Sequence, residues 1–234
     1  MKAYKRIRKL TEVVYDLIKD MNNEVVIADV GADHGYLSES LSRIDKVQKI
    51  YAIEISNKCL EKVIKLKQNF NLHKIEPVLS DGLTNIEKVN LSVLAGIGGY
   101  ETINIIKNQN NNGKNKCGIF VLQPSDNLLE LKNWINQNKF LVIRDFVFES
   151  AKRFYPVIVV DVTKKQECEM TEFDFYLGRD NSIKDKEFVN YLYHLSGLLD
   201  YLNNLINERI LTDKTLVEKQ KIKCLIENLL KDLK

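Results

Sequence analysis

Acidic residues and glycines alternate in the stretch Asp29-Val30-Gly31-Ala32-Asp33-His34-Gly35, directly after a run of β-branched apolar residues. Glycines between a strand and a helix let the backbone approach a ligand, and the free N–H groups of the helix N-terminus point at that ligand. The Gly-x-Gly-x-x-Gly spacing of a dinucleotide-binding turn is absent, because Asp33 and His34 follow Gly31. An acidic residue two positions before the first glycine fits a ligand that carries an ammonium group, and S-adenosylmethionine is the obvious candidate.

Two more carboxylates follow at the ends of the next predicted strands. Glu54 ends the apolar run 49–55, about 20 residues beyond the glycines, where a carboxylate can accept both ribose hydroxyls. Asp81 ends the third run, where it can accept the adenine amino group. Each acid alone reads as an ordinary turn residue, whereas three at successive strand ends predict a cofactor site. Its predicted residues are Asp29, Gly31, Asp33, His34, Gly35, Glu54, Ile55, Asp81, Gly82, Ala95 and Gly96.

The fourth predicted strand ends in Leu94-Ala95-Gly96-Ile97-Gly98-Gly99-Tyr100. Enzymes that methylate exocyclic amino groups usually hold an Asn/Asp-Pro-Pro-aromatic turn here, and this chain lacks it. The glycines leave room and free N–H donors beside the cofactor and the reacting atom. The alternative is a glycine-rich connection to the next helix.

These motifs require a particular order of helices and strands. Apolar residues at helical spacing predict a helix over residues 4–20, and strands then alternate with helices, including 57–70 and 127–137. The β-rich runs 140–148 and 155–162 are joined by a link too short for a crossover helix, so they predict an antiparallel hairpin at the sheet edge. We expect an α/β fold, a Rossmann-like seven-stranded methyltransferase sheet. Residues 173–177 can add a short strand, and 108–115 form a surface loop.

The pattern changes after Gly178. Apolar residues recur in steps of four and three from Phe188 to Ile206, and a second such seam runs from Ile222 to Leu233. Residues 211–213 supply a stop and an N-cap between them. We expect a methyltransferase domain over 1–178 and a C-terminal antiparallel coiled-coil helical hairpin over 179–234. A single long dimerising helix is the competing interpretation.

Composition limits the remaining functions. The net charge of +3 over 234 residues is too small to indicate nucleic-acid binding by itself, although five basic residues crowd the first ten positions without one acid. That cluster is either a solvated helix start or a phosphate-contacting patch. The four scattered cysteines are typical of free thiols in a reducing compartment. With no signal peptide or transmembrane run in the sequence, we expect a cytoplasmic monomer that uses neither metal nor membrane.

The combination of motifs resembles the bacterial family of tRNA (adenine-22-N1)-methyltransferases. The resemblance rests on Asp29 to Leu37, Ser80-Asp81-Gly82-Leu83, Ala95-Gly96-Ile97-Gly98-Gly99 and Leu122-Gln123-Pro124, and it covers essentially the whole chain. Gly35 stands where the family pattern suggests a small residue such as alanine, and Tyr155-Pro156 where it suggests Tyr-Glu.

The resemblance implies methyl transfer from S-adenosylmethionine to N1 of an adenine in the tRNA D-arm. N1 lies on the pairing edge, so the base must leave its stack and enter the pocket, and an aromatic platform is expected. Tyr36 is the first candidate, although a tyrosine in a turn is often a packing residue. Asp33 can hold the cofactor amino group or cap the helix, and His34 can shuttle a proton or fix the turn. The predicted catalytic residues are Tyr36, Asp33, Gly96 and Gly98, and the predicted tRNA contacts are Lys5, Arg6, Arg8, Lys9, Tyr100, Lys152, Arg153 and Tyr155.

Three alternatives remain open at this point. The chain can methylate another RNA, a protein or a small molecule. It can be a nucleotide-dependent oxidoreductase, against which Asp29 and the missing glycine spacing argue. It can also be a catalytically silent RNA-binding protein, against which the intact set of three carboxylates argues.

Overall fold

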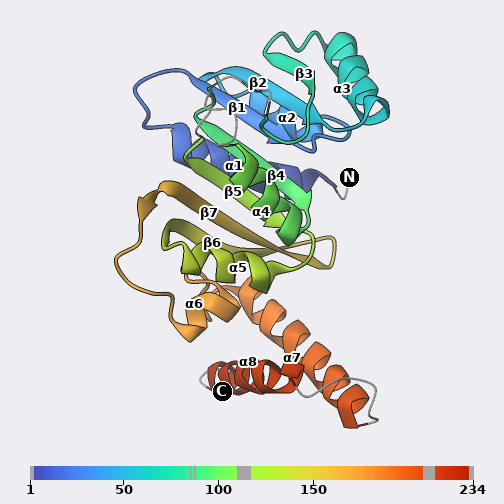
Figure 1. The fold of residues 1–234 in the computed structure, drawn as a ribbon. Helices are drawn as coiled ribbons and strands as arrows, with labels where there is room; N and C mark the ends of the chain where they lie inside the picture. Colours follow the sequence, from blue (N-terminus) through green and yellow to red (C-terminus); the bar gives the residue numbers. More distant parts are fainter. Residues whose placement is uncertain (1–2, 85, 87, 110–116, 208–213, 232–234) are drawn as a thin grey trace.

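The computed structural model describes residues 3–84, 86, 88–109, 117–207 and 214–231. Within them, seven strands form one sheet in the order β3-β2-β1-β4-β5-β7-β6 (Figure 1). Strands β1 to β5 pair in parallel, whereas β7 runs antiparallel to both β5 and β6. This arrangement confirms the predicted methyltransferase sheet with its edge hairpin. The strands are β1 (Val25–Val30), β2 (Val47–Glu54), β3 (Ile75–Leu79), β4 (Leu91–Ile97), β5 (Ile119–Pro124), β6 (Phe140–Ser150) and β7 (Arg153–Lys165).

Helices cover both faces of the sheet. One apolar core lies between the sheet and helices α1, α2 and α3, and a second core lies between the opposite face and helices α4 and α5. The predicted helix over 57–70 is confirmed as α3, with Ser56 accepting a hydrogen bond from Cys59 N at its start and Asn71 ending it in the left-handed conformation. The helices are α1 (Ala3–Ile18), α2 (Tyr36–Ser42), α3 (Asn57–Phe70), α4 (Gly99–Asn108), α5 (Leu128–Gln137), α6 (Glu172–Leu177), α7 (Lys186–Asn207) and α8 (Lys214–Lys231).

The expected short strand at residues 173–177 is wrong, because this segment is helix α6. Thr171 and Asp174 form a capping box, in which each side chain accepts a hydrogen bond from the other residue's backbone N–H. Phe173, Tyr176 and Leu177 then fall on one helical face and join a third apolar cluster. The cap and the helical spacing outweigh the β propensity of the aromatic residues.

Helices α7 and α8 share that third cluster. Leu192 and Leu199 of α7 are buried with Ile226 of α8, and Lys223 of α8 forms an ion pair of 2.7 Å with Asp200 of α7. This pairing is the one expected for two helices that run antiparallel. The predicted turn at 211–213 and most of the predicted loop at 108–115 lie outside the described residues. Among the described helices, none combines the length and apolar composition that crossing a membrane requires.

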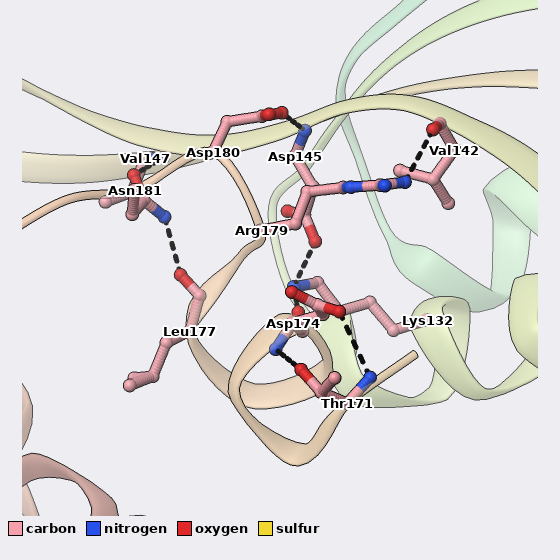
Figure 2. A network of polar contacts seen from close by, with 10 residues as sticks. All are labelled: Lys132, Val142, Asp145, Val147, Thr171, Asp174, Leu177, Arg179, Asp180 and Asn181. Carbon is pink, nitrogen blue, oxygen red and sulfur yellow. Dashed lines mark hydrogen bonds and ion pairs between the residues drawn. The ribbon is translucent and has the colours of Figure 1, made fainter. Parts of the chain in front are cut away.

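A buried ion pair anchors the lower part of this region to the sheet (Figure 2). Lys132 of α5 lies 2.7 Å from Asp145 of β6, and their side chains are 2% and 4% exposed. Lys132 Nζ also donates to the carbonyl oxygen of Asp174 in α6. Burial raises the pKa of Asp145, and the neighbouring Lys132 partly offsets this rise. The pair therefore joins α5, β6 and α6 at one point.

The segment after α6 is hydrogen-bonded along β6 (Figure 2). Asp145 N donates to the Asp180 carboxylate at 2.6 Å, and Asp180 N donates back to Asp145 O at 2.9 Å. Asn181 accepts from Val147 N, and Arg179 donates to Val142 O. Residues 179–181 thus satisfy the outer backbone groups of the edge strand β6. The proposed domain boundary at Gly178 stays a prediction, and this contact fixes the chain that leads into α7.

Candidate active site

A cleft of about 750 Å³ opens at the carboxyl ends of β1 and β4. Helix α1 forms one wall of it, the turn after β1 forms another, and the β6–β7 turn closes a third side. Ligands of doubly wound sheets bind at this edge, where the strand order reverses. The lining residues are Arg6, Ile7, Leu10, Asp29, Gly31, Ala32, Asp33, His34, Tyr36, Leu37, Ala95, Gly96, Ala151, Arg153 and Tyr155.

Asp29 supplies a buried carboxylate to this cleft. It is 2% exposed, and Ser38 Oγ donates to its Oδ2 at 2.6 Å. Burial raises the pKa of Asp29 to about 6, while Ser38 and Arg6 lower it and Glu54 adds to the rise. A bound cation would relieve the cost of ionising this carboxylate. The geometry suits the ammonium group that the sequence pattern predicted.

The turn after β1 needs its two glycines. Gly31 and Gly35 have φ angles of +72° and +73°, in the left-handed region that side chains disfavour. A Cβ on Gly35 would also lie 2.9 Å from Leu66 Cδ2 of α3. Gly35 therefore departs from alanine because its backbone conformation and its contact with α3 both require glycine.

Asp33 does not cap helix α2, so that predicted role is wrong. The N-cap position is Gly35, and the Asp33 carboxylate turns to His34 Nδ1 and to Lys62 Nζ of α3, each at 2.6 Å. Partial burial would raise the pKa of Asp33, but the hydrogen bonds from Lys62 and His34 lower it below its ordinary value. The His34 ring lies parallel to the Tyr36 ring, with 5.6 Å between centroids and 5° between planes. Asp33 and Lys62 thus hold a two-ring surface at the cleft.

The other predicted cofactor carboxylates lie on the same edge of the sheet. Glu54 at the end of β2 is 7% exposed and accepts a hydrogen bond from Asp33 N. Asp81 follows β3 and is exposed, next to Gly82 with a φ of +56°. The parallel register of β1, β2 and β3 brings Asp29, Glu54 and Asp81 to successive strand ends. Their roles toward a cofactor stay predictions.

The glycines after β4 divide into two groups. Gly96 lines the cleft with a φ of +83°, and a Cβ there would lie 3.0 Å from Arg6 Nη2. Gly98 and Gly99 instead face the start of α5, where added Cβ atoms would meet Asp126 at 2.9 Å and Asn127 O at 2.3 Å. Gly96 keeps the cleft open, whereas Gly98, predicted as catalytic, lets two helix starts pack together.

The predicted tRNA contacts do not form one patch. Arg6, Arg153 and Tyr155 line the cleft, and Tyr155 stacks on Phe148. The side chains of Lys5, Arg8 and Lys9 form ion pairs with Glu187 or Glu12. Tyr100 and Lys152 are exposed and do not line the cleft.

Two further residues at the site were missed by sequence reasoning. Gln123 at the end of β5 is buried and accepts a hydrogen bond from Arg6 Nε at 2.7 Å. Lys62 anchors Asp33 from a lysine-rich helix in which nothing singles it out. The motif Leu122-Gln123-Pro124 was a signal for the first residue, and no local pattern marks the second.

Comparison with known proteins identifies the family. The family model TrmK, described as tRNA (adenine(22)-N(1))-methyltransferase, matches residues 27–231. A Mycoplasma genitalium protein with the provisional name of tRNA methyltransferase is 32% identical over 164 residues, 68% of this chain and 72% of its own. The tRNA (adenine(22)-N(1))-methyltransferase of Bacillus subtilis is 23% identical over 236 residues, 94% of each chain.

Solved structures show the same fold over the whole chain. The TrmK structure of M. capricolum in complex with S-adenosyl-homocysteine has a TM-score of 0.72 and 21% identity, and the match covers 97% of this chain and 95% of that one. The TrmK structure of B. subtilis has a TM-score of 0.72 and 19% identity, with 97% of both chains covered. The chain therefore belongs to the TrmK family of tRNA (adenine(22)-N(1))-methyltransferases.

Proposed function

We propose that this protein transfers a methyl group from S-adenosylmethionine to N1 of adenine 22 in tRNA, and that the reaction takes place in the cleft beside Asp29. Family membership gives the reaction and the cofactor. The observation that supports the site is a cleft of about 750 Å³ that combines a buried carboxylate, an open glycine shelf and a parallel pair of rings. A tRNA-modifying enzyme of this kind works in the cytoplasm, and we keep the expectation of a monomer.

The residues present fit the cofactor. S-adenosylmethionine supplies the activated methyl group on its sulfonium. Asp29 faces the cleft for the ammonium group, Glu54 stands at the β2 end for the ribose hydroxyls, and Asp81 stands after β3 for the adenine amino group. Glycines with positive φ at positions 31, 82 and 96 let the backbone come close to such a ligand.

The chemistry asks little of the protein beyond positioning. N1 of neutral adenine carries an available lone pair, so no strong base has to generate the nucleophile. The rate depends on holding N1 in line with the methyl group at near-attack distance. Tyr36 is 50% exposed and stacked on His34, so the ring pair can receive an extruded base on a surface that Asp33 holds in place.

The tRNA backbone meets the protein around the cleft mouth. Arg153 lines the cleft and Lys152 lies beside it in the β6–β7 turn, where its φ of +61° holds it in a tight turn. Substituting Lys152 and Arg153 by alanine should weaken tRNA binding and lower the salt dependence by about one counter-ion for each phosphate that is no longer neutralised. Binding of S-adenosylhomocysteine by the Lys152 variant should stay at the parent level.

Helices α7 and α8 provide a second surface for tRNA. Deleting everything after Gly178 would test this poorly, because Phe188 and Leu192 share a buried cluster with Val147 of β6. The exposed rings of Tyr193 and Tyr201, each 59% exposed, give a cleaner test. Their substitution by serine should weaken tRNA binding without changing cofactor affinity. Unchanged tRNA affinity would remove α7 from the substrate surface.

The decisive experiment maps the modified base. A tRNA transcript is incubated with the protein and methyl-labelled cofactor, and mass spectrometry locates methyladenosine. Label should appear at adenine 22 and disappear when that base is replaced by guanine. Label on another base or molecule would favour a different methyltransferase substrate. Incorporation no higher than without enzyme would favour a non-catalytic RNA-binding protein.

A further inference from the structure

Arg6 points into the cleft, unlike its basic neighbours in the first turns of α1. Its Nε donates to Gln123 Oε1 at 2.7 Å, and its guanidinium lies 5.5 Å from the centre of the Tyr155 ring. Lys5 instead pairs with Glu187 of α7, and Arg8 pairs with Glu12 on the outer face of the helix. A contact with the outer tRNA backbone is therefore a poor description of Arg6.

The guanidinium of Arg6 has further N–H groups to satisfy. One of its five donors is engaged by Gln123, and Nη2 lies beside Gly96 at the floor of the cleft. Within the described ranges, no carboxylate lies within 4.0 Å of this guanidinium. Burial lowers the pKa of Arg6, although Tyr155 and Asp29 partly offset this. A half-buried cation at a cleft wall favours an anionic ligand.

Arg6 and Asp29 present opposite charges to the same cleft. They interact electrostatically without a direct ion pair among the described contacts, so there is space between them for a ligand. An α-amino acid carries an ammonium group and a carboxylate on one carbon, which is the charge pattern complementary to this pair. A tRNA phosphate, in contrast, would supply no partner for Asp29.

We propose that Arg6 binds the α-carboxylate of the methionine part of S-adenosylmethionine, opposite Asp29 and its ammonium group. This assignment rests on the proposed function, and it moves Arg6 from the tRNA surface to the cofactor site. The planar guanidinium suits a carboxylate because it can donate two parallel hydrogen bonds. The product S-adenosylhomocysteine keeps the same carboxylate, so Arg6 stabilises the bound cofactor before and after transfer.

Two ligands that differ in the amino-acid part test the proposal. Calorimetry measures S-adenosylhomocysteine and 5′-methylthioadenosine, which lacks both the ammonium and the carboxylate, with the parent protein and with Arg6→Met, which keeps the apolar stem. Removing a charge-assisted hydrogen bond should weaken S-adenosylhomocysteine binding about 10- to 100-fold and change 5′-methylthioadenosine binding less than about threefold. The matched control Arg8→Met, on the outer face of α1, should leave both affinities at the parent level.

Several outcomes would overturn the assignment. Equal weakening of both ligands would mean that Arg6 only supports the cleft wall. Unchanged affinity for both, with weaker tRNA binding and a smaller salt dependence, would make Arg6 a phosphate contact. Should Arg6→Met fail to fold by circular dichroism, Arg6→Lys replaces it, and the ratio of the two affinities must still fall.

This test is separate from that of the function. A parent protein that binds S-adenosylhomocysteine but does not methylate adenine 22 would refute the proposed reaction. The Arg6 assignment would survive that result if the two ligands still responded differently to Arg6→Met.

Discussion

Replacing Asp29 by asparagine should make the ligand-free protein more stable at neutral pH. Asp29 is 2% exposed, and burial raises the pKa of its carboxyl to about 6 from an ordinary value of 3.8. At 1.36 kcal/mol per pKa unit, ionised Asp29 costs the folded protein about 3 kcal/mol at pH 7. Asparagine has nearly the same shape and can still accept the hydrogen bond from Ser38 Oγ. The amide does not ionise, so this cost disappears.

The sign of the effect follows from linkage. A carboxyl group whose pKa is higher in the folded state favours folding when it is protonated. The parent protein therefore loses stability as the pH rises from about 4 through about 6, and the loss is complete above that range. The stability advantage of Asp29→Asn should be absent near pH 4 and should reach at most about 3 kcal/mol above pH 7. In a chain of this size that corresponds to an increase in Tm of about 6 to 12 °C.

Thermal melts of both proteins between pH 4.5 and 8 provide the measurement. Affinity for S-adenosylhomocysteine should change in the opposite direction, because asparagine offers no charge to an ammonium group, and we expect about 10- to 100-fold weaker binding at pH 7.5. Ser38→Ala is the matched control, since it keeps the carboxylate and removes only its hydrogen bond, and it should destabilise the protein at neutral pH. A difference in Tm between Asp29→Asn and the parent that is constant across pH would refute the reasoning.

Three further predictions concern other parts of the structure. Tyr36→Ala should lower kcat/KM for tRNA about tenfold or more while leaving S-adenosylhomocysteine affinity unchanged, and Tyr36→Phe, which keeps the stacking face, should stay near the parent in the same methylation assay. Lys132→Met should cost about 3 to 5 kcal/mol in urea unfolding because Asp145 stays buried without its cation, and a cost below about 1 kcal/mol would contradict the buried pair. Gly35→Ala should destabilise by about 1 to 3 kcal/mol because of its positive φ and the Leu66 contact, whereas Gly197→Ala, with open space around its Cβ in mid-helix, should stabilise by about 0.5 to 1 kcal/mol.

The sheet was predictable because local signals and topology rules agree. Val25–Val30 is apolar and buried on both faces, and the alternation of strands and helices leaves few allowed orders. The short link after residue 150 excluded a crossover helix and so fixed the antiparallel edge. Helix α6 was missed because aromatic residues in a short segment favour a strand, while the capping box of Thr171 and Asp174 decides the outcome.

The candidate site was only partly predictable, because sequence gives a residue's place along an element and not its direction. Asp29, Glu54 and Asp81 were found, since the end of a parallel strand fixes where each side chain lies. The basic residues of α1 were treated as one group, yet the helix turns Arg6 inward and Arg8 outward. Lys62 reaches Asp33 across 29 positions, a pairing that depends on how α3 packs against the turn after β1.

The C-terminal helices and the cleft wall share helix α1. Glu187 at the start of α7 accepts from Lys5 Nζ and from Glu149 N of β6, which ties α7 both to the sheet edge and to α1. These groups are partly exposed, so their contribution to stability is small, and their effect is on geometry. The residue after Lys5 is Arg6, which faces the cleft. The angle at which α7 leaves the sheet is therefore set at a place one residue away from a side chain of the cofactor site, although the sequence separates the two regions by more than 170 positions.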